Sequence, residues 1–270
     1  MVVAVAALCV AASGGAYAAT QINGHSIQNG TITPAKLNKL ARNRLYHAVG
    51  QHWGVIDRNT IGSGVADLRA GPYGSYGLTG PGTSPPHGVG SLGIQVSDQA
   101  TSRSPASEKV SFGNEVDFYG DPVSGLSDAG FRVFQTGENA TIGLRNLPNI
   151  SLEINPNVAS VNYTQMVWVP GAAPVNKWSG YMNAATTGDW YFTNSAVATA
   201  TGCTQALTCS LADAKQALVD QNDGSGPATI DTIAVSKGRD NAWAGAVDDL
   251  RINSKVYNFE PYGVVATAAP

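Results

Sequence analysis

The sequence predicts a mainly β protein, built as an antiparallel β-sandwich, and three observations support this prediction. Only 13% of the 270 residues are charged, while 31 are glycine and 14 are proline, a composition unlike that of helical bundles and coiled coils. Hydrophobic residues make up 43% of the chain, which is too apolar for a disordered protein. Many short candidate strands also follow one another at nearly regular spacing, with little helix between them.

Charge and hydropathy argue against two classes of function. The net charge of −3 gives no overall attraction for nucleic acid. No apolar run reaches the roughly 18 residues that a membrane-spanning helix needs. We therefore expect neither a nucleic-acid partner nor a transmembrane span.

The first 18 residues are expected to be a secretory signal peptide. Residues 1–12 are uninterrupted apolar residues, and Ala16 and Ala18 form a small-x-small pattern before a polar segment. This pattern predicts cleavage after Ala18 and export to the cell surface or the medium. No lysine or arginine precedes the apolar run, which a translation start upstream of Met1 would explain. A buried N-terminal strand or helix is the alternative interpretation.

Residues 19–50 are expected to form a basic stalk or linker with one short helix. The segment carries four Lys and Arg residues and no acidic residue. Thr33 can cap a helix that has Pro34 at its first position, and Leu37 and Leu40 follow at helical spacing. These features are typical of a homo-oligomerisation element or of a contact with an anionic cell-envelope polymer. A solvated spacer is the alternative.

Glycine and proline turns dominate residues 51–105, so we expect a loop region that only partly joins the sandwich and holds no catalytic residue. The sandwich domain is expected at residues 106–264, followed by a tail at 265–270. The candidate strands combine β-branched, aromatic or alternating apolar residues with flanking turn signals. They are residues 88–96, 109–119, 131–135, 150–154, 163–169, 178–182, 189–193, 230–235, 245–253 and 256–259.

One short helix is predicted within the sandwich, at residues 210–219. Ser210 is a suitable N-cap for this helix. Leu211, Ala214 and Leu218 recur at helical spacing after it, so they form one apolar face.

Two cysteines of the mature chain, Cys203 and Cys209, are separated by five residues. Export favours a disulfide between them. A zinc site would need two more ligands, and no histidine follows His87 in the chain. We therefore expect a disulfide that closes a local loop, and a loop this short removes little chain entropy.

The most enzyme-like feature is a Glu-x-Asp motif at Glu115 and Asp117. On one continuous strand these two side chains would point to the same face. Jelly-roll glycoside hydrolases add a second glutamate as the acid/base, but Tyr119 or Gly120 occupies that position here. We therefore expect the two carboxylates to contribute to ligand binding. A degenerate glycoside hydrolase and a solvated strand face are the alternatives.

The acidic run at residues 220–226 superficially resembles a calcium loop. It lacks the ligand pattern of an EF-hand, so an acidic turn is the expected structure. Exported sandwiches often hold structural calcium, which makes Ca²⁺ the one cofactor that we consider.

Aromatic residues are the remaining signal of a binding site. Sugar rings stack on exposed aromatic faces beside polar groups that fix their hydroxyls. Trp178, Tyr181 and Trp190 are the candidates, because both tryptophans are flanked by polar residues or glycine. A place in the sandwich core is the alternative for each tryptophan.

Two parts of the chain resemble exported bacterial proteins. Residues 22–32, with Lys36 and Leu37, resemble a segment common after the signal peptide of exported actinobacterial proteins. The stretches that carry the second resemblance are residues 113–118, 203–211, 235–240, 245–253 and 256–261. They resemble exported proteins of uncharacterised function with a concanavalin- or laminin-G-like jelly-roll domain, over roughly residues 88–264. The resemblance implies export and a jelly-roll sandwich, and it implies no activity and no site residues.

Taken together, the sequence predicts an exported, non-catalytic sandwich that binds carbohydrate or another cell-surface ligand. A structural surface or appendage protein that assembles through residues 19–50 is the second hypothesis. A glycoside hydrolase with a degenerate motif is the third.

Overall fold

The computed structural model describes residues 52–72, 82–97, 108–143 and 145–270. These residues belong to one compact unit, His47–Pro270. The expected signal peptide and basic stalk lie outside the described residues. Within the described ranges, no helix has the length and the apolar character needed to cross a membrane.

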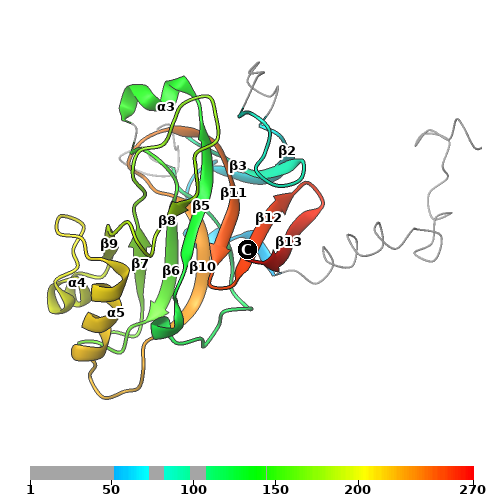
Figure 1. The fold of residues 1–270 in the computed structure, drawn as a ribbon. Helices are drawn as coiled ribbons and strands as arrows, with labels where there is room; N and C mark the ends of the chain where they lie inside the picture. Colours follow the sequence, from blue (N-terminus) through cyan, green and yellow to red (C-terminus); the bar gives the residue numbers. More distant parts are fainter. Residues whose placement is uncertain (1–51, 73–81, 98–107, 144) are drawn as a thin grey trace, which may run out of the picture. The chain divides into compact units, whose positions relative to one another are not determined.

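The described chain forms two antiparallel sheets, as the sequence predicts (Figure 1). One sheet has six strands in the order β1-β4-β10-β6-β7-β9, and we call it the six-stranded sheet. Its strands are β1 (Trp53–Val55), β4 (Val110–Asn114), β10 (Thr229–Lys237), β6 (Asn149–Asn155), β7 (Thr164–Trp168) and β9 (Trp190–Phe192).

The other sheet has seven strands arranged around β11, and we call it the seven-stranded sheet. Residues 245–247 of β11 pair with both β3 and β5, whereas residues 251–252 pair with both β5 and β12. Strands β3 and β12 therefore share one edge of β11, and β5 occupies the other edge. The strands are β2 (Val65–Ala70), β3 (Gly90–Val96), β5 (Ala129–Gln135), β8 (Met182–Asn183), β11 (Trp243–Ile252), β12 (Lys255–Glu260) and β13 (Gly263–Ala268).

The apolar faces of both sheets belong to a single buried cluster. Leu152 and Ile233 contribute to it from the six-stranded sheet, and Leu92, Val133 and Val247 contribute from the seven-stranded sheet. Each such side chain stabilises the fold by roughly 1.5–3 kcal/mol when it leaves water. The two sheets thus pack face to face, as in a β-sandwich.

Helix α5 (Leu211–Asp220) confirms the helix expected at residues 210–219. The Ser210 hydroxyl accepts a hydrogen bond of 3.0 Å from the backbone N–H of Asp213, which satisfies one free donor of the first turn. Leu211, Ala214 and Leu218 are buried, so the expected apolar face does pack on the core.

The expectation of a single short helix is wrong. Two further α-helices and two short 3₁₀ turns lie in the described ranges: α3 (Gly137–Ile142), α4 (Ser195–Thr201), η3 (Asp57–Asn59) and η4 (Val123–Gly125). Helix α4 is rich in alanine and β-branched residues and shows no clear apolar period, so its ends define it. Asn194 caps its start by accepting from two backbone N–H groups, and Gly202 follows its last residue in the left-handed conformation.

The loop region at residues 51–105 contributes β1, β2 and β3 to the sheets, and β13 occupies most of the expected tail. By contrast, the strand expected at residues 178–182 is reduced to β8 and an isolated bridge at Trp178. Strand β3 is the one expected at residues 88–96, whereas β1, β2, β8 and β13 are short or lie at sheet edges, where few neighbouring residues mark them in the sequence.

The expected disulfide between Cys203 and Cys209 is confirmed, with a Cα–Cα distance of 5.3 Å. The loop that it closes is tied to the edge strand β9 by backbone hydrogen bonds. Trp190 and Cys209 exchange two such bonds, and the N–H of Phe192 donates to the carbonyl of Cys203. Together with α4 and α5, which lie side by side next to β9, this loop closes that end of the six-stranded sheet (Figure 1).

Candidate functional site

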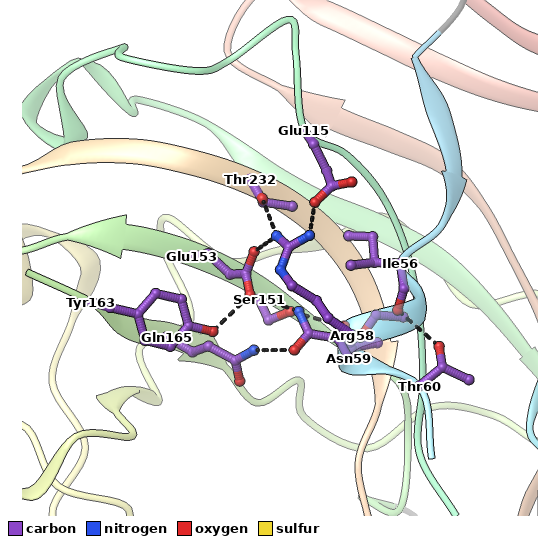
Figure 2. Close-up of polar contacts among 12 residues, drawn as sticks. Ile56, Arg58, Asn59, Thr60, Glu115, Ser151, Glu153, Tyr163, Gln165 and Thr232 are labelled. Atoms are coloured by element: carbon purple, nitrogen blue, oxygen red, sulfur yellow. Dashed lines mark hydrogen bonds and ion pairs between the residues drawn. The ribbon is translucent and has the colours of Figure 1, made fainter. Parts of the chain in front are cut away.

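A group of polar side chains gathers on the outer face of the six-stranded sheet, opposite its core-facing side. We call it the Arg58 cluster (Figure 2). Its members come from η3, from the turn after β4, and from β6, β7 and β10 or the loops next to them. They are Arg58, Asn59, Glu115, Glu153, Tyr163, Gln165 and Thr232.

Strand β1 and the turn η3 bring Arg58 and Asn59 onto this face. The backbone N–H of Ile56 donates to the carbonyl of Ser111, and the chain returns to the sheet at the bridge between Ile61 and Lys109. Between these two points the Ile56 side chain lies directly on Gly113. A Cβ atom at Gly113 would lie 2.8 Å from Cδ1 of Ile56, so a glycine at this position permits the close approach.

Glu153 is the centre of the cluster, because its side chain is only 2% exposed and yet accepts several hydrogen bonds. The Asn59 amide and the Tyr163 hydroxyl each donate to Oε1 over 2.7 Å. Arg58 donates to Oε2 of Glu153 and also pairs with Glu115. Figure 2 shows the Arg58 guanidinium between the two carboxylates, with its third contact, at 3.2 Å, to the hydroxyl of Thr232.

These contacts set the protonation states of the cluster. Burial by itself raises the pKa of Glu153, but hydrogen bonds from Tyr163, Asn59 and Arg58 outweigh burial and hold that pKa below its usual value. Burial and the acceptor Glu153 together raise the pKa of Tyr163 to about 12. At neutral pH the cluster therefore contains a carboxylate at Glu153 and a neutral phenol at Tyr163.

Asp231 lies on β10 beside a register shift between Ile230 and Thr232. Partial burial and the negative charge of Glu153 raise the pKa of its carboxyl, and the positive charge of Arg58 lowers it by a smaller amount. This carboxyl therefore differs from Glu153 in the direction of its pKa shift.

Glu115 and Asp117 do not lie on a strand, so the prediction that they share a strand face is wrong. Strand β4 ends at Asn114, whose side-chain oxygen accepts from the backbone N–H groups of Val116 and Asp117. This side chain competes with the sheet for the backbone and turns the chain away from β10.

The two carboxylates of the Glu-x-Asp motif consequently have different partners. Glu115 pairs with Arg58, while Asp117 accepts hydrogen bonds of 2.7 Å from both His52 and Asn114. Burial alone raises the pKa of Asp117, but these two hydrogen bonds outweigh burial and lower it. Only Glu115 of this predicted pair belongs to the Arg58 cluster.

Trp190 is 0% exposed, so the prediction of an exposed ring is wrong. Its indole N–H donates to the carbonyl of Ala184 over 2.8 Å. Because side chains alternate along β9, Trp190 and Phe192 face the core while Tyr191 faces outward and stays partly exposed. The polar residues around Trp190 belong to the turns at the ends of this short strand.

Trp178 and Tyr181 are partly exposed, but they lie against the seven-stranded sheet. The Trp178 ring packs on Phe134 of β5, with ring centroids 5.8 Å apart. The Tyr181 hydroxyl donates to Asp128 over 3.1 Å, and the Arg251 guanidinium covers one face of its ring at 4.3 Å. The aromatic and acidic candidates therefore do not form one site.

A second charged group lies within the seven-stranded sheet. Asp248 and Asp249 are both 0% exposed. Asp248 accepts from the backbone N–H groups of Phe259 and His87, over 3.0 and 3.4 Å. Burial, and to a smaller extent the charge of Asp249, raises the pKa of Asp248 to about 7. These bonds tie β12 and the loop before β3 to β11.

Sequence reasoning missed most of the Arg58 cluster. A charged residue at Glu153, between Leu152 and Ile154 of an apolar strand, is a usable signal, because buried carboxylates need partners. No comparable signal marks Arg58, which sits in a stretch rich in loops.

The described residues hold no group of three or more His, Cys, Asp or Glu side chains that could bind a metal ion. Calcium therefore stays a prediction without an assigned site. Comparison of the chain with protein-family models, with curated proteins and with solved structures yields no match in any of the three.

Proposed function

We propose that this protein is an exported, non-catalytic sandwich of the jelly-roll, concanavalin- or laminin-G-like type, and that it binds carbohydrate on the outer face of the six-stranded sheet. The Arg58 cluster is the observation that carries this proposal. It presents carboxylate, amide, guanidinium and phenol groups within one patch, and carbohydrate hydroxyls can both donate to and accept from such groups.

The cluster combines exposed groups with a rigid support. Tyr163 is 47% exposed, so a face of its ring is available to a sugar, while its hydroxyl is held by the buried Glu153. The Arg58 side chain is 52% exposed and the Glu115 side chain 45% exposed, although both are fixed by their ion pair. Because these groups are already oriented, binding would cost little side-chain entropy.

The same contacts support a binding role over hydrolysis. A glycoside hydrolase needs one carboxyl that stays protonated to donate to the leaving group. Glu153 has a lowered pKa, and Arg58 forms ion pairs with both Glu153 and Glu115. Carboxylates held in this way are acceptors and poor proton donors.

The test is binding of the mature chain to a glycan array, with calcium and with a chelator. We expect binding that the Tyr163→Ala variant reduces about tenfold or more, since stacking and a hydrogen-bonding network are lost. Tyr262→Ala is the matched control, because Tyr262 is an exposed tyrosine in the turn between β12 and β13 of the other sheet. Absence of binding to every glycan, with and without calcium, would contradict the proposal.

A glycoside hydrolase is the second candidate, and the raised pKa of Asp231 next to Glu153 is the observation that favours it. In this alternative Asp231 is the proton donor and Glu153 is the second carboxylate. Turnover of a polysaccharide that both Asp231→Asn and Glu153→Gln abolish would support it. A lack of turnover on a broad polysaccharide panel would remove it.

A further inference from the structure

A second polar pocket opens on the same face of the six-stranded sheet, next to the Arg58 cluster. Its volume is about 140 Å³, and Lys109, Arg239, Asn149 and Gln165 are among the residues that line it. Gln165 connects the two features, because its amide N–H also donates to Asn59 of the cluster over 3.5 Å. A ligand that covers the cluster therefore reaches this pocket along the sheet.

Two cations at this pocket form no direct ion pair with a described residue. Among the ion pairs formed by described residues, none involves Lys109 or Arg239. The neighbouring Lys237, in contrast, pairs with Asp240. Partial burial, and next the positive charge of Arg239, lower the pKa of Lys109, while the negative charge of Glu153 raises it by a smaller amount. The fold thus holds two like charges near each other at a cost that a bound anion would relieve.

Buried polar groups also lie at this pocket, and two of them, Ser151 and Ser236, line it. The hydroxyls of Ser111, Ser236 and Ser151 form a row with oxygen–oxygen distances of 2.7 and 2.8 Å. Beside this row, the side-chain oxygen of Asn149 is buried and has no hydrogen-bond donor among the described residues. A buried acceptor of this kind is costly unless a ligand or a water donates to it.

We infer that this pocket is an anion-binding subsite, and that the carbohydrate bound at the Arg58 cluster carries an acidic group, a uronic acid carboxylate, that lies between Lys109 and Arg239. The inference rests on the proposed function and specifies its ligand class. The Arg239 guanidinium can bind a carboxylate through two parallel hydrogen bonds, and the Lys109 ammonium adds a point charge. A hydroxyl of the same sugar donates to the Asn149 oxygen.

The size of the pocket agrees with this assignment. A volume of about 140 Å³ is smaller than the roughly 300–1,000 Å³ of sites that enclose a whole small molecule. It therefore accommodates one charged group of a longer chain, while the rest of the chain lies across the sheet toward Tyr163. The carboxylates of the Arg58 cluster lie at the other end of this surface and repel an acidic sugar there. The ligand is therefore expected to bind in one orientation, with its carboxylate in the pocket.

The experiment compares acidic ligands with their neutral forms on the full mature chain. One arm is an array of uronic acid oligosaccharides printed beside their carboxyl-reduced forms. The other arm is a titration with inorganic phosphate and sulfate, followed by the NMR signals of the pocket amides. Lys109→Gln and Arg239→Gln are the test variants. Lys255→Gln is the matched control, because Lys255 is an exposed lysine on β12 of the other sheet.

We expect the protein to prefer the acidic oligosaccharides. Each test variant should reduce this preference about tenfold, which is the effect of losing one charge-assisted hydrogen bond. Lys255→Gln should leave the preference unchanged. Equal binding of acidic and neutral forms, with no effect of the variants, would overturn the anion subsite and leave the proposed function standing. Binding of phosphate or sulfate alone, with no glycan bound, would keep the anion pocket and overturn the carbohydrate ligand. Failure of every probe would overturn both.

Discussion

Glu153 shows how a single buried carboxylate can organise a surface. Its side chain is 2% exposed, and it accepts hydrogen bonds from Arg58 and Asn59, which lie far from it in the sequence, and from Tyr163, which directly precedes β7. A buried charge is tolerated only when such partners surround it. The geometry of the whole cluster therefore depends on this residue.

Glu153→Gln is expected to lower the free energy of unfolding by about 1–3 kcal/mol, because charge-assisted hydrogen bonds are replaced by weaker ones in a buried position. Glu115→Gln removes the other partner of Arg58 and is the matched comparison, since its side chain is 45% exposed. For this exposed pair we expect a loss of less than about 1 kcal/mol. Urea denaturation measures both variants, and equal losses would contradict the central role of Glu153.

The raised pKa of Asp248 predicts that the stability of the fold depends on pH. Its carboxyl has an ordinary pKa of 3.8 in the unfolded chain and about 7 in the folded protein, where it is 0% exposed. Between these values the unfolded chain releases the proton while the folded protein keeps it. The stability that this group contributes is therefore complete below about pH 4 and falls by on the order of 4 kcal/mol as the pH rises to 7.

The measurement compares the parent protein with Asp248→Asn across this pH range. The amide resembles the protonated acid and does not titrate, so the difference in unfolding free energy between the two proteins should change in favour of the variant as the pH rises. A difference that stays constant from pH 4 to 8 would contradict the shifted pKa.

At the scale of elements, Gly113 allows Ile56 and the following turn η3 to pack closely on β4. A Cβ atom at this position would lie 2.6 Å from the carbonyl oxygen of Ile233 and 2.7 Å from Cβ of Ala234. The close packing of Ile56 on β4 is what carries Arg58 over the sheet. An element of only three residues, η3, is thus positioned by the absence of a side chain on its neighbour.

Gly113→Ala is therefore expected to destabilise the protein by about 1–3 kcal/mol, as overpacking does in cores, and to displace Arg58 from Glu153. Gly54→Ala is the control, because Gly54 pairs with Gly113 in the sheet but a Cβ atom added to it would have no neighbour within 4 Å. Unfolding curves and glycan binding check both variants. Unchanged binding by Gly113→Ala would contradict this account of how Arg58 is placed.

The disulfide between Cys203 and Cys209 acts on the edge strand β9. The closed loop is short, so the loss of the bond in a Cys203→Ala, Cys209→Ala double variant is expected to cost about 2 kcal/mol. Because the loop pairs with Trp190 and Phe192, the amides of β9 should lose protection first. Hydrogen exchange measures this, and a uniform loss over both sheets would argue against a local effect.

At the scale of the whole molecule, aromatic contacts join the two sheets into one core. Phe131 of β5 meets Trp168 of β7 edge to face at 5.4 Å. Trp53 of β1 lies 5.0 Å from Tyr257 of β12, again across the two sheets. Since neither sheet has a separate core, neither is expected to persist when the other unfolds.

The prediction is a single cooperative unfolding transition of the described residues. Tryptophan fluorescence reports on Trp168 and Trp190 in one sheet and on Trp243 in the other, while far-UV circular dichroism reports on all strands. The midpoints from both probes should coincide. Two resolved transitions would show that the sheets unfold separately.

Local patterns allowed much of the fold to be predicted. The alternation of Ile150, Leu152 and Ile154 marked β6, and Ser210 with three apolar residues marked α5. Such signals depend on neighbours within a few residues, because strand and helix periods are local properties of the backbone. The same locality explains the errors at Glu115 and Asp117, where apolar alternation at Val116 and Phe118 continued past the end of a real strand.

By itself, the sequence determined the mainly β character, the long strands, one capped helix and the disulfide. The tertiary structure decided which polar residues share a surface. Arg58 and Glu153 are 95 positions apart, and the packing of Ile56, just before η3, on Gly113 helps to bring them together. It also decided that Trp190 is buried and Tyr191 is partly exposed. Contacts between distant segments depend on how whole elements pack, and a periodicity of a few residues carries no information about that packing.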